Sequence, residues 1–233
     1  KIILRRTLRN FLIQFAVTCW RLDGVNVLLN KQINSLEIIL SFSTQSPAFL
    51  SSKEQKQSNL LLGLPRYKSW LYGRSALKNL LSNLNLDMDT SRLTFPNSRF
   101  SLSHCVNLAV AAGLLTEQKS IDGIGVDLEL NRSVTDMHTK FYLSRIERRS
   151  ALDNDDRIRL WTIKEALFKA DPDNQYTVLG HYEIEDPSLL QGKAKNNRGR
   201  SFYYSCEKLP MDKIFEIRSG GWISCAVSFS SST

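Results

Sequence analysis

Residues 123–129 read GIGVDLE, a strict alternation of two kinds of side chain. A period of two is typical of a β-strand, so the aliphatic residues of this stretch are expected to face a core. Asp127 and Glu129 then point together to the opposite face. Two neighbouring carboxylates repel each other unless a cation lies between them. The stretch therefore indicates either a metal-binding pair or a solvated edge with Arg132 as an ion-pair partner.

A second stretch, WTIKEALFK at residues 161–169, has the period of an α-helix. Trp161, Glu165 and Lys169 are four positions apart and share one stripe, while the aliphatic residues supply a buried side. A Glu–Lys pair at this spacing also has an ordinary role, because it stabilises an isolated helix by about 0.2–0.5 kcal/mol. A tryptophan in such a helix is more often part of a core than of a binding site.

Taken together, the strand and the helix offer three carboxylates and two lysines. The predicted ligands are Asp127, Glu129 and Glu165, with Lys164 and Lys169 nearby. Carboxylates of this kind suit Mg²⁺, which completes its shell with waters and with phosphate oxygens of a substrate.

A third stretch, FSLSH at residues 100–104, would place Ser103 and His104 at the end of a neighbouring strand. The histidine there either contacts a phosphate or caps a strand turn. The remaining periodicities predict an α+β protein. Helices are expected at about residues 51–64, 66–84, 144–152 and 155–170, strands near 17–21, 100–112, 121–129, 177–183, 201–207 and 222–229, and a basic hairpin loop at 192–200.

Several patterns occur twice in the same order. Leu-Ser-x-x-Glu at residues 50–54 recurs at 143–147, and the spaced pattern that begins at Trp70 recurs from Trp161, with a further echo of the Ser-His-Cys segment near the C-terminal end. Ser-x-x-Glu by itself is also the capping box of a helix start. Three echoes in order predict two related α/β subdomains about a pseudo-twofold axis, divided as residues 16–120 and 121–233. A cleft between them is a natural ligand site.

The composition excludes several classes of protein. With 42% hydrophobic and 23% charged residues, the chain is neither disordered, collagen-like nor a coiled coil. Four scattered cysteines without a CxxC pair exclude a thiolate zinc cluster and indicate reduced thiols. Walker-type, HExxH and GxSxG motifs are absent, and the GxG at residues 123–125 lacks the third glycine of a dinucleotide fingerprint.

The charge and the N-terminal residues bear on the partner and the cellular location of the protein. A net charge of +8 favours a polyanionic partner. Residues 11–20 are mostly apolar, but this is about half the length that a membrane span needs. We therefore expect a cytoplasmic protein that has no contact with a membrane.

FSLSH, GIGVDLE and WTIKEALFK occur in the same order and at similar spacing as the three motifs of the 4′-phosphopantetheinyl transferases. The chain resembles the larger, surfactin-synthetase-activating type of this family, which consists of two fused halves. The resemblance covers roughly residues 48–230. It implies the fold of that family, an active site in the cleft between the halves, and a monomer.

The resemblance also implies a reaction. Such an enzyme, a holo-acyl-carrier-protein synthase, moves the 4′-phosphopantetheine arm of coenzyme A to a serine of an apo acyl or peptidyl carrier protein and releases adenosine 3′,5′-bisphosphate. On the matching positions, Asp127, Glu129 and Glu165 hold Mg²⁺ on the diphosphate. Glu165, or a water on the metal, helps to deprotonate the serine, and Lys169 stabilises the phosphate.

Contacts to coenzyme A are implied at further basic and polar positions. These are Ser103 and His104 on the strand, Arg66 and Arg74 on the N-terminal helix, Lys164 beside the metal set, and Lys53 and Lys56 near the 3′-phosphate. The family usually has a Gly-Lys-Pro before its Ser-x-Ser-His segment. Residues 87–97 contain no such motif, so the lysine that touches the substrate phosphates has no counterpart there.

The partner and two alternative functions remain to be weighed. Carrier proteins are acidic, so positive charge at residues 144–149 and 192–200 would steer the encounter, although either segment also fits an ordinary solvated face. A nucleic-acid-binding module would need exposed aromatic residues among the charges, for which only residues 202–204 qualify. An inactive scaffold of the same fold is the other alternative. The carboxylates argue against both, and we expect no nucleic-acid partner.

Overall fold

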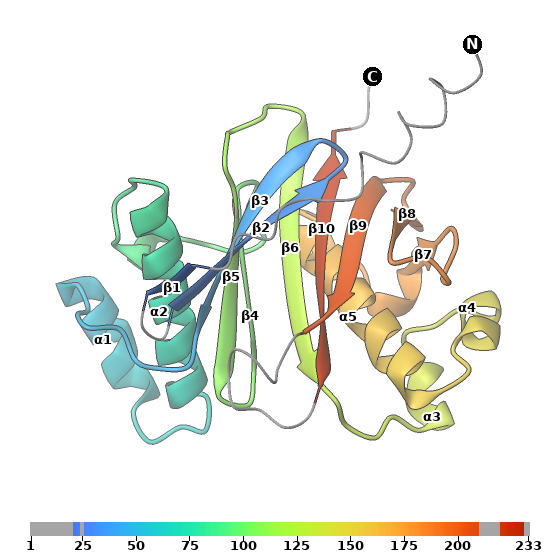
Figure 1. Cartoon of the computed structure of the whole chain (residues 1–233), viewed down its shortest axis with the longest axis horizontal. Coiled ribbons are helices and arrows are strands. Elements are labelled where there is room, and N and C mark those ends of the chain that lie inside the picture. The colour runs from blue at the N-terminus through green and yellow to red at the C-terminus, as the bar shows by residue number, and fades with distance from the viewer. Residues whose placement is uncertain (1–20, 24–25, 210–219, 231–233) are drawn as a thin grey trace, which may run out of the picture.

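The computed structural model describes residues 21–23, 26–209 and 220–230. In these residues the chain forms two antiparallel five-stranded sheets with helices on their outer faces (Figure 1). The first sheet has the strand order β1 (Arg21–Asp23), β2 (Asn26–Ile33), β3 (Leu36–Ser43), β5 (Leu108–Leu114) and β4 (Phe100–Cys105). The second has the order β6 (Ile121–Leu130), β10 (Gly221–Phe229), β9 (Ser201–Lys208), β8 (Gln191–Asn196) and β7 (Tyr182–Ile184). The predicted α+β class is confirmed.

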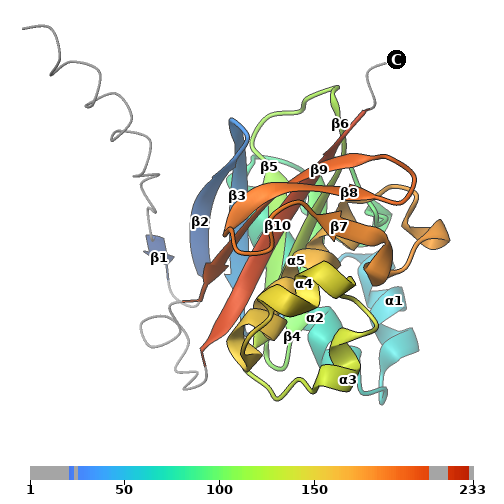
Figure 2. The ribbon, with the colours of Figure 1, turned by 90° about the vertical axis from the view of Figure 1, so that its right-hand side faces the viewer.

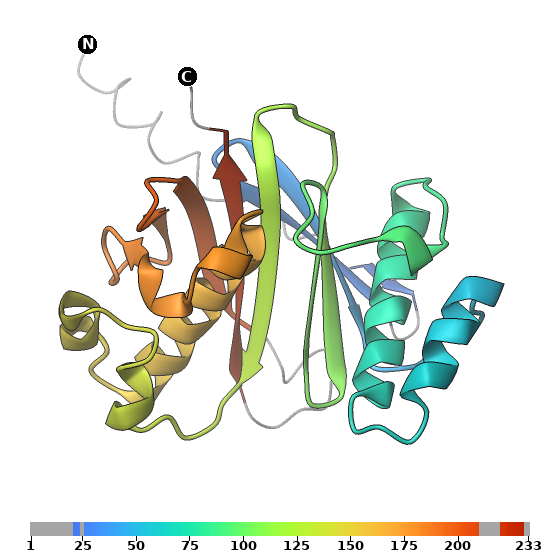
Figure 3. The same ribbon diagram turned by 180° about the vertical axis from the view of Figure 1, so that it is seen from behind.

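Two long helices cover the sheets from outside. The first, α2 (Tyr67–Asn83), packs on the first sheet, and α5 (Asn154–Ala170) packs on the second (Figure 3). Beside α2 lies α1 (Ser52–Leu61), whereas α3 (Asp136–Thr139) and α4 (Arg145–Ser150) lie on the side of α5. No helix within the described ranges has the length and apolar character needed to cross a membrane.

The main core lies between the two sheets. Buried aliphatic residues of β2, β3 and β5 meet those of β6 and β10, among them Leu40, Val126 and Val227. A second core joins α2 to the outer face of the first sheet, and a third joins α5 to the outer face of the second. The layers therefore follow the order helix, sheet, sheet, helix, and Figure 2 shows β2 and β3 beside β10 in this arrangement.

The two sheets also adjoin along their edge strands β4 and β6, a place that we call the β4–β6 junction. The amide of Ile124 donates to the carbonyl of Asn97 at 3.1 Å, in an isolated backbone bridge. Further along, the hydroxyl of Ser101 accepts a hydrogen bond from the amide of Val126 at 2.9 Å. A serine of one edge strand thus satisfies a backbone group of the other, which a continuous ladder would otherwise do.

The glycines of GIGVDLE let α5 lie directly on β6. A Cβ atom on Gly125 would stand 1.9 Å from the carbonyl oxygen of Ala166, and one on Gly123 would stand 2.2 Å from that of Ala170. Both contacts are with backbone atoms, which cannot rotate away as a side chain can. The short residues on both elements therefore set the close approach of helix and strand.

Two helix starts are built alike. In α1 the capping residue is Ser51 with Glu54, and in α4 it is Ser144 with Glu147; both pairs form a complete capping box. The ordinary structural role of Ser-x-x-Glu is therefore present at both positions. Each glutamate is also buried beside a lysine, which adds an ion pair to the cap.

The first ion pair joins Glu54 to Lys78 of α2 at 2.7 Å, and Glu54 also accepts from the amide of Thr90 at 2.9 Å. Burial would raise the pKa of Glu54, but Lys78, Thr90 and Ser51 together hold it below its ordinary value. The second joins Glu147 to Lys164 of α5 at 2.6 Å, and the Lys164 ammonium also donates to the carbonyl of Tyr182.

Replacing Lys164 by methionine is expected to lower the free energy of unfolding by about 3–5 kcal/mol, because Glu147 would keep a buried charge without its partner. Urea denaturation measures the change. The matched control is Lys208→Met, since Lys208 is 67% exposed in its pair with Asp155 and should cost less than about 1 kcal/mol. Equal effects of the two substitutions would contradict a structural role for Lys164.

Several predicted elements need correction. The single strand expected at 100–112 is a hairpin of β4 and β5, because the chain turns at residues 106–107. The strand expected at 177–183 is short, since residues 174–181 mostly form two 3₁₀ turns before β7. Most of the basic loop expected at 192–200 is strand β8, whose exposed lysines alternate with buried residues. The strand expected at 17–21 lies outside the described residues except for Arg21.

Candidate functional site

Asp127 lies at the centre of the candidate site, on β6 at the β4–β6 junction. One carboxylate oxygen, Oδ1, accepts from the Lys169 ammonium at 2.7 Å and from the Ser103 hydroxyl at 2.8 Å. Lys169 also donates to the Ser103 oxygen at 3.0 Å. The three side chains come from β6, α5 and β4, so the site joins both sheets and the helix.

The other carboxylate oxygen of Asp127, Oδ2, is buried and has no hydrogen-bond partner among the described residues. A buried carboxylate oxygen without a partner is costly, because it has lost water and gained nothing in return. The oxygen is therefore a candidate position for a ligand or a cation.

Glu165 lies one helical turn before Lys169 and faces the same group of charges. Burial raises the pKa of Glu165, the charge of Asp127 raises it further, Lys169 opposes the shift, and Glu129 adds to it. Glu129 itself pairs with Arg132, with 3.3 Å between Oε2 and Nε. The predicted carboxylates are thus within one electrostatic neighbourhood, and the alternative partner Arg132 is also present.

The local sequence explains why these groups meet. On β6 the two glycines, Asp127 and Glu129 share the face toward α5, while the aliphatic residues face the core between the sheets. On α5, Ala166 and Ala170 rest on the glycines, so Glu165 and Lys169 are brought beside the carboxylates. The stripe predicted from the helical spacing is confirmed as a single half-buried face.

His104 extends from β4 next to Ser103 but on the opposite side of the strand. Its side chain is exposed, and it lies within electrostatic range of the site. Partial desolvation lowers the pKa of His104, Lys169 lowers it further, and Asp127 opposes the shift. The neutral imidazole is therefore favoured near neutral pH.

Three predicted contacts do not join this group. Lys164 is fully buried with Glu147, because it lies on the side of α5 that faces α4 and β7, so it is removed from the predicted cofactor contacts. Arg66 is exposed at the start of α2. Arg74 donates to the carbonyl of Thr90 at 3.0 Å and lies over the ring of Trp70.

The donor set suits a hard divalent cation, as Asp127 Oδ2 and the neighbouring carboxylates of Glu129 and Glu165 indicate. As the side chains stand, however, no three Asp, Glu, His or Cys residues in the described part of the chain are arranged around one point as a ligand shell. Instead, Lys169 forms an ion pair with Asp127, and Arg132 forms one with Glu129. The residues fit Mg²⁺ by the hard oxygen chemistry of their carboxylates.

Two residues near the site were not predicted. Ser101 ties β4 to β6, and Cys105 lies with its Sγ 3.7 Å from Oε2 of Glu129. Burial raises the pKa of the Cys105 thiol, and Glu129 and Asp127 raise it further. The signal was in the sequence, since residues 101, 103 and 105 of one strand must share a face.

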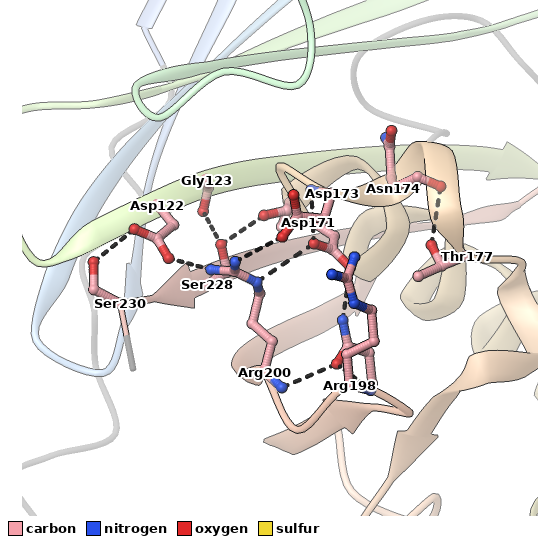
Figure 4. Close-up of polar contacts among 12 residues, drawn as sticks. Asp122, Gly123, Asp171, Asp173, Asn174, Thr177, Arg198, Arg200, Ser228 and Ser230 are labelled. Atoms are coloured by element: carbon pink, nitrogen blue, oxygen red, sulfur yellow. Dashed lines mark hydrogen bonds and ion pairs between the residues drawn. The ribbon is translucent and has the colours of Figure 1, made fainter. Parts of the chain in front are cut away.

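The C-terminal end of α5, which carries Lys169, is held by a polar network (Figure 4). The carbonyl of Ala170 accepts from the hydroxyl of Ser228 at 2.6 Å. The next residue, Asp171, is fully buried and accepts from Tyr182 at 2.9 Å and from Asn196 at 2.8 Å. The C-terminal end of α5 is therefore held from three strands.

Arg200 completes this network, because its guanidinium pairs with Asp122, Asp171 and Asp173. Part of the positive charge of the basic segment at 192–200 is therefore neutralised by aspartates of the protein itself. Of the aromatic residues at 202–204, Phe202 and Tyr204 are buried, whereas Tyr203 is partly exposed with the Lys193 ammonium over its ring.

Residues 123–214 match the model of the 4′-phosphopantetheinyl transferase superfamily. The matched segment begins at the first glycine of β6 and contains Asp127, Glu129, Glu165 and Lys169. A search of curated proteins found no match to the chain. The match supports this superfamily and, in general terms, a phosphopantetheinyl transferase activity.

Proposed function

We propose that the protein transfers the 4′-phosphopantetheine arm of coenzyme A to a serine of an apo acyl or peptidyl carrier protein, with the help of Mg²⁺. The observation that carries the proposal is the joining of Asp127, Lys169 and Ser103 at the β4–β6 junction, with Glu165 and Glu129 beside them. The superfamily match covers four of these residues.

In the proposed reaction the carrier serine oxygen attacks the pantetheine-bound phosphorus of the diphosphate. The new P–O bond replaces the bond to the adenosine bisphosphate, which leaves with the bridging oxygen. Glu165 takes the serine proton, either directly or through a water, a role that its place beside Asp127, Glu129 and Lys169 supports. Lys169 places a positive charge where negative charge grows on the phosphate.

Mg²⁺, when bound, would supply positive charge that neutralises the diphosphate. Asp127, Glu129 and Glu165 would hold it. Support comes from the unpartnered Oδ2 of Asp127 and from the hard oxygen chemistry of the three side chains. Ser103 orients Asp127 through its 2.8 Å hydrogen bond.

We place coenzyme A along β4, between the site and α2. The helix lies against β4 where Gly73 meets Leu102, the residue before Ser103. His104 lies two positions beyond Leu102, on the same face of the strand, and can donate to a phosphate oxygen. Arg74 and Arg66 belong to the same helix and remain candidates for the more distant phosphate.

The proposed carrier surface is the outer side of α3 and α4. Four large apolar side chains are exposed there: Met137, Phe141, Ile146 and Leu152. Basic residues Lys140, Arg145 and Arg149 stand exposed among them. Exposed apolar side chains together with exposed basic ones suit an acidic helical protein, because opposite charges steer the encounter.

We further propose that residues 16–120 and 121–233 are related halves. Each sheet carries one 17-residue helix and one capping-box glutamate that pairs with a lysine from that helix. The two lysines that pair with these glutamates, Lys78 and Lys164, are 86 positions apart, so they are five positions out of step with Trp70 and Trp161, which are 91 positions apart.

The function is tested by incubating the full chain with coenzyme A, Mg²⁺ and an apo carrier protein, followed by mass spectrometry of the carrier. A gain of one phosphopantetheine is expected, and none on a carrier whose acceptor serine is alanine. Several acyl and peptidyl carriers are assayed, because the pathway is not specified by the site. Absence of the mass gain on all of them would overturn the proposed function.

A further inference from the structure

Lys169 holds the place that a cation would take at the candidate site. Its ammonium lies 2.7 Å from Oδ1 of Asp127 and 3.0 Å from the hydroxyl of Ser103. Asp127 is only 7% exposed, so its charge has little help from water. The lysine is thus the main neutralising contact of a nearly buried carboxylate.

The second carboxylate of the strand is neutralised in the same way. Arg132 lies 3.3 Å from Glu129, and its guanidinium also lies over the ring of Trp161. Arg132 is 45% exposed and Lys169 is 26% exposed, so both cations reach the site from its solvent side. The strand therefore presents two carboxylates, each with a basic partner that can withdraw toward solvent.

Asp127 is only partly satisfied by this arrangement. Oδ1 receives two hydrogen bonds, whereas Oδ2 is buried and receives none from the described residues. A permanent structural ion pair would be expected to satisfy both oxygens, as the buried Glu54 and Glu147 are satisfied. The contrast indicates that Asp127 is kept for a second partner.

We propose that Lys169 is an exchangeable counter-ion, which leaves Asp127 when a divalent cation binds and then turns to the phosphate oxygens of the substrate. This inference rests on the proposed function, and it adds the order of events: the cation binds Asp127 first, and Lys169 then turns to the phosphate. The flexible stem of a lysine allows the movement, because only its terminal ammonium must shift while α5 stays in place. The same charge stabilises the carboxylate before binding and the phosphate afterwards.

If Lys169 only supported the metal ligands, its replacement would weaken metal binding. The exchange predicts the opposite change in metal affinity. Without the lysine charge, a divalent cation no longer competes for Asp127, so metal binding should become stronger while transfer becomes weaker. Mn²⁺ titration of the full chain without coenzyme A, followed by electron paramagnetic resonance of the free ion, measures this directly. We expect Lys169→Met to bind Mn²⁺ about tenfold more tightly than the unaltered chain, a difference equivalent to about 1.4 kcal/mol.

Three variants make the comparison specific. Lys169→Gln keeps a hydrogen-bond donor without the charge and should behave as Lys169→Met does, which also covers the case in which the methionine variant folds poorly. Lys169→Arg keeps the charge and should bind Mn²⁺ as the unaltered chain does. Lys193→Met removes an exposed lysine from β8, three strands from β6, and should change nothing.

The outcomes separate this inference from the proposed function. If the unaltered chain modifies a carrier but the neutral variants bind Mn²⁺ no more tightly, the exchange is wrong and the function stands. If the neutral variants bind Mn²⁺ more tightly and no carrier is modified, the exchange stands and the function fails. If no variant, nor the unaltered chain, binds Mn²⁺, the exchange is overturned, and the carrier assay alone decides the proposed function.

Discussion

Replacing Gly125 by alanine is expected to separate α5 from β6 and to abolish transfer. The new Cβ would stand 1.9 Å from the Ala166 oxygen and 2.7 Å from the Ala170 nitrogen, so the helix backbone would have to move. Overpacking typically costs 1–3 kcal/mol, and here neither contact can relax by rotation, so we expect about 3 kcal/mol or more. Because Glu165 and Lys169 ride on α5, the displacement would also take them from Asp127.

The measurement is urea denaturation together with the carrier-modification assay. Gly180→Ala is the matched control, since its Cβ would meet only the Phe141 oxygen at 3.4 Å, an ordinary contact. That variant should retain both stability and transfer. A Gly125→Ala variant that unfolds at the same urea concentration as the unaltered chain would show that the helix does not depend on the close approach.

Replacing Asp127 by asparagine should leave the fold intact and reduce transfer at least about 100-fold, the typical effect of removing one electrostatic stabiliser from a reaction centre. Asparagine has nearly the same shape and still accepts from Ser103. Lys169 loses its ion pair but is partly exposed and reaches water. The loss should therefore appear in catalysis and in Mn²⁺ affinity rather than in the urea midpoint.

The control for this variant is Glu117→Gln, which removes the charge of an exposed glutamate that pairs with Arg99 at 2.5 Å. The Glu117 side chain is 76% exposed, so transfer should remain within about twofold, in keeping with the small energies of surface ion pairs. Transfer by Asp127→Asn at the rate of this control would remove Asp127 from the proposed mechanism.

The central elements of the fold follow from local patterns. The period-two alternation of GIGVDLE and the four-residue spacing from Trp161 to Lys169 each predict one element and the face that it presents. The two Ser-x-x-Glu segments predict helix starts, which the capping boxes at Ser51 and Ser144 confirm. These elements can be predicted from the sequence because their patterns depend only on residues within one helical turn or one strand.

Other features depend on contacts between distant residues and could not be predicted from local patterns. Lys164 looked like a member of the charged site, but its burial is decided by Glu147, which comes from another helix. The basic run at 192–200 predicts a loop, because its alternation of lysines with small and polar residues lacks the aliphatic residues that mark a strand. The glycines of β6 resembled a nucleotide fingerprint, and their contact with α5 emerged only with the helix in place.

The position of β10 has a consequence for the synthesis of the chain. This strand lies between β6 and β9, yet it is the last strand along the sequence that the structure describes. The inner faces of β2 and β3 pack against it and against β6, so their aliphatic residues have no complete cover until residues 221–229 leave the ribosome. During translation the N-terminal half must therefore wait with an uncovered apolar face, which is the condition under which nascent chains need chaperones.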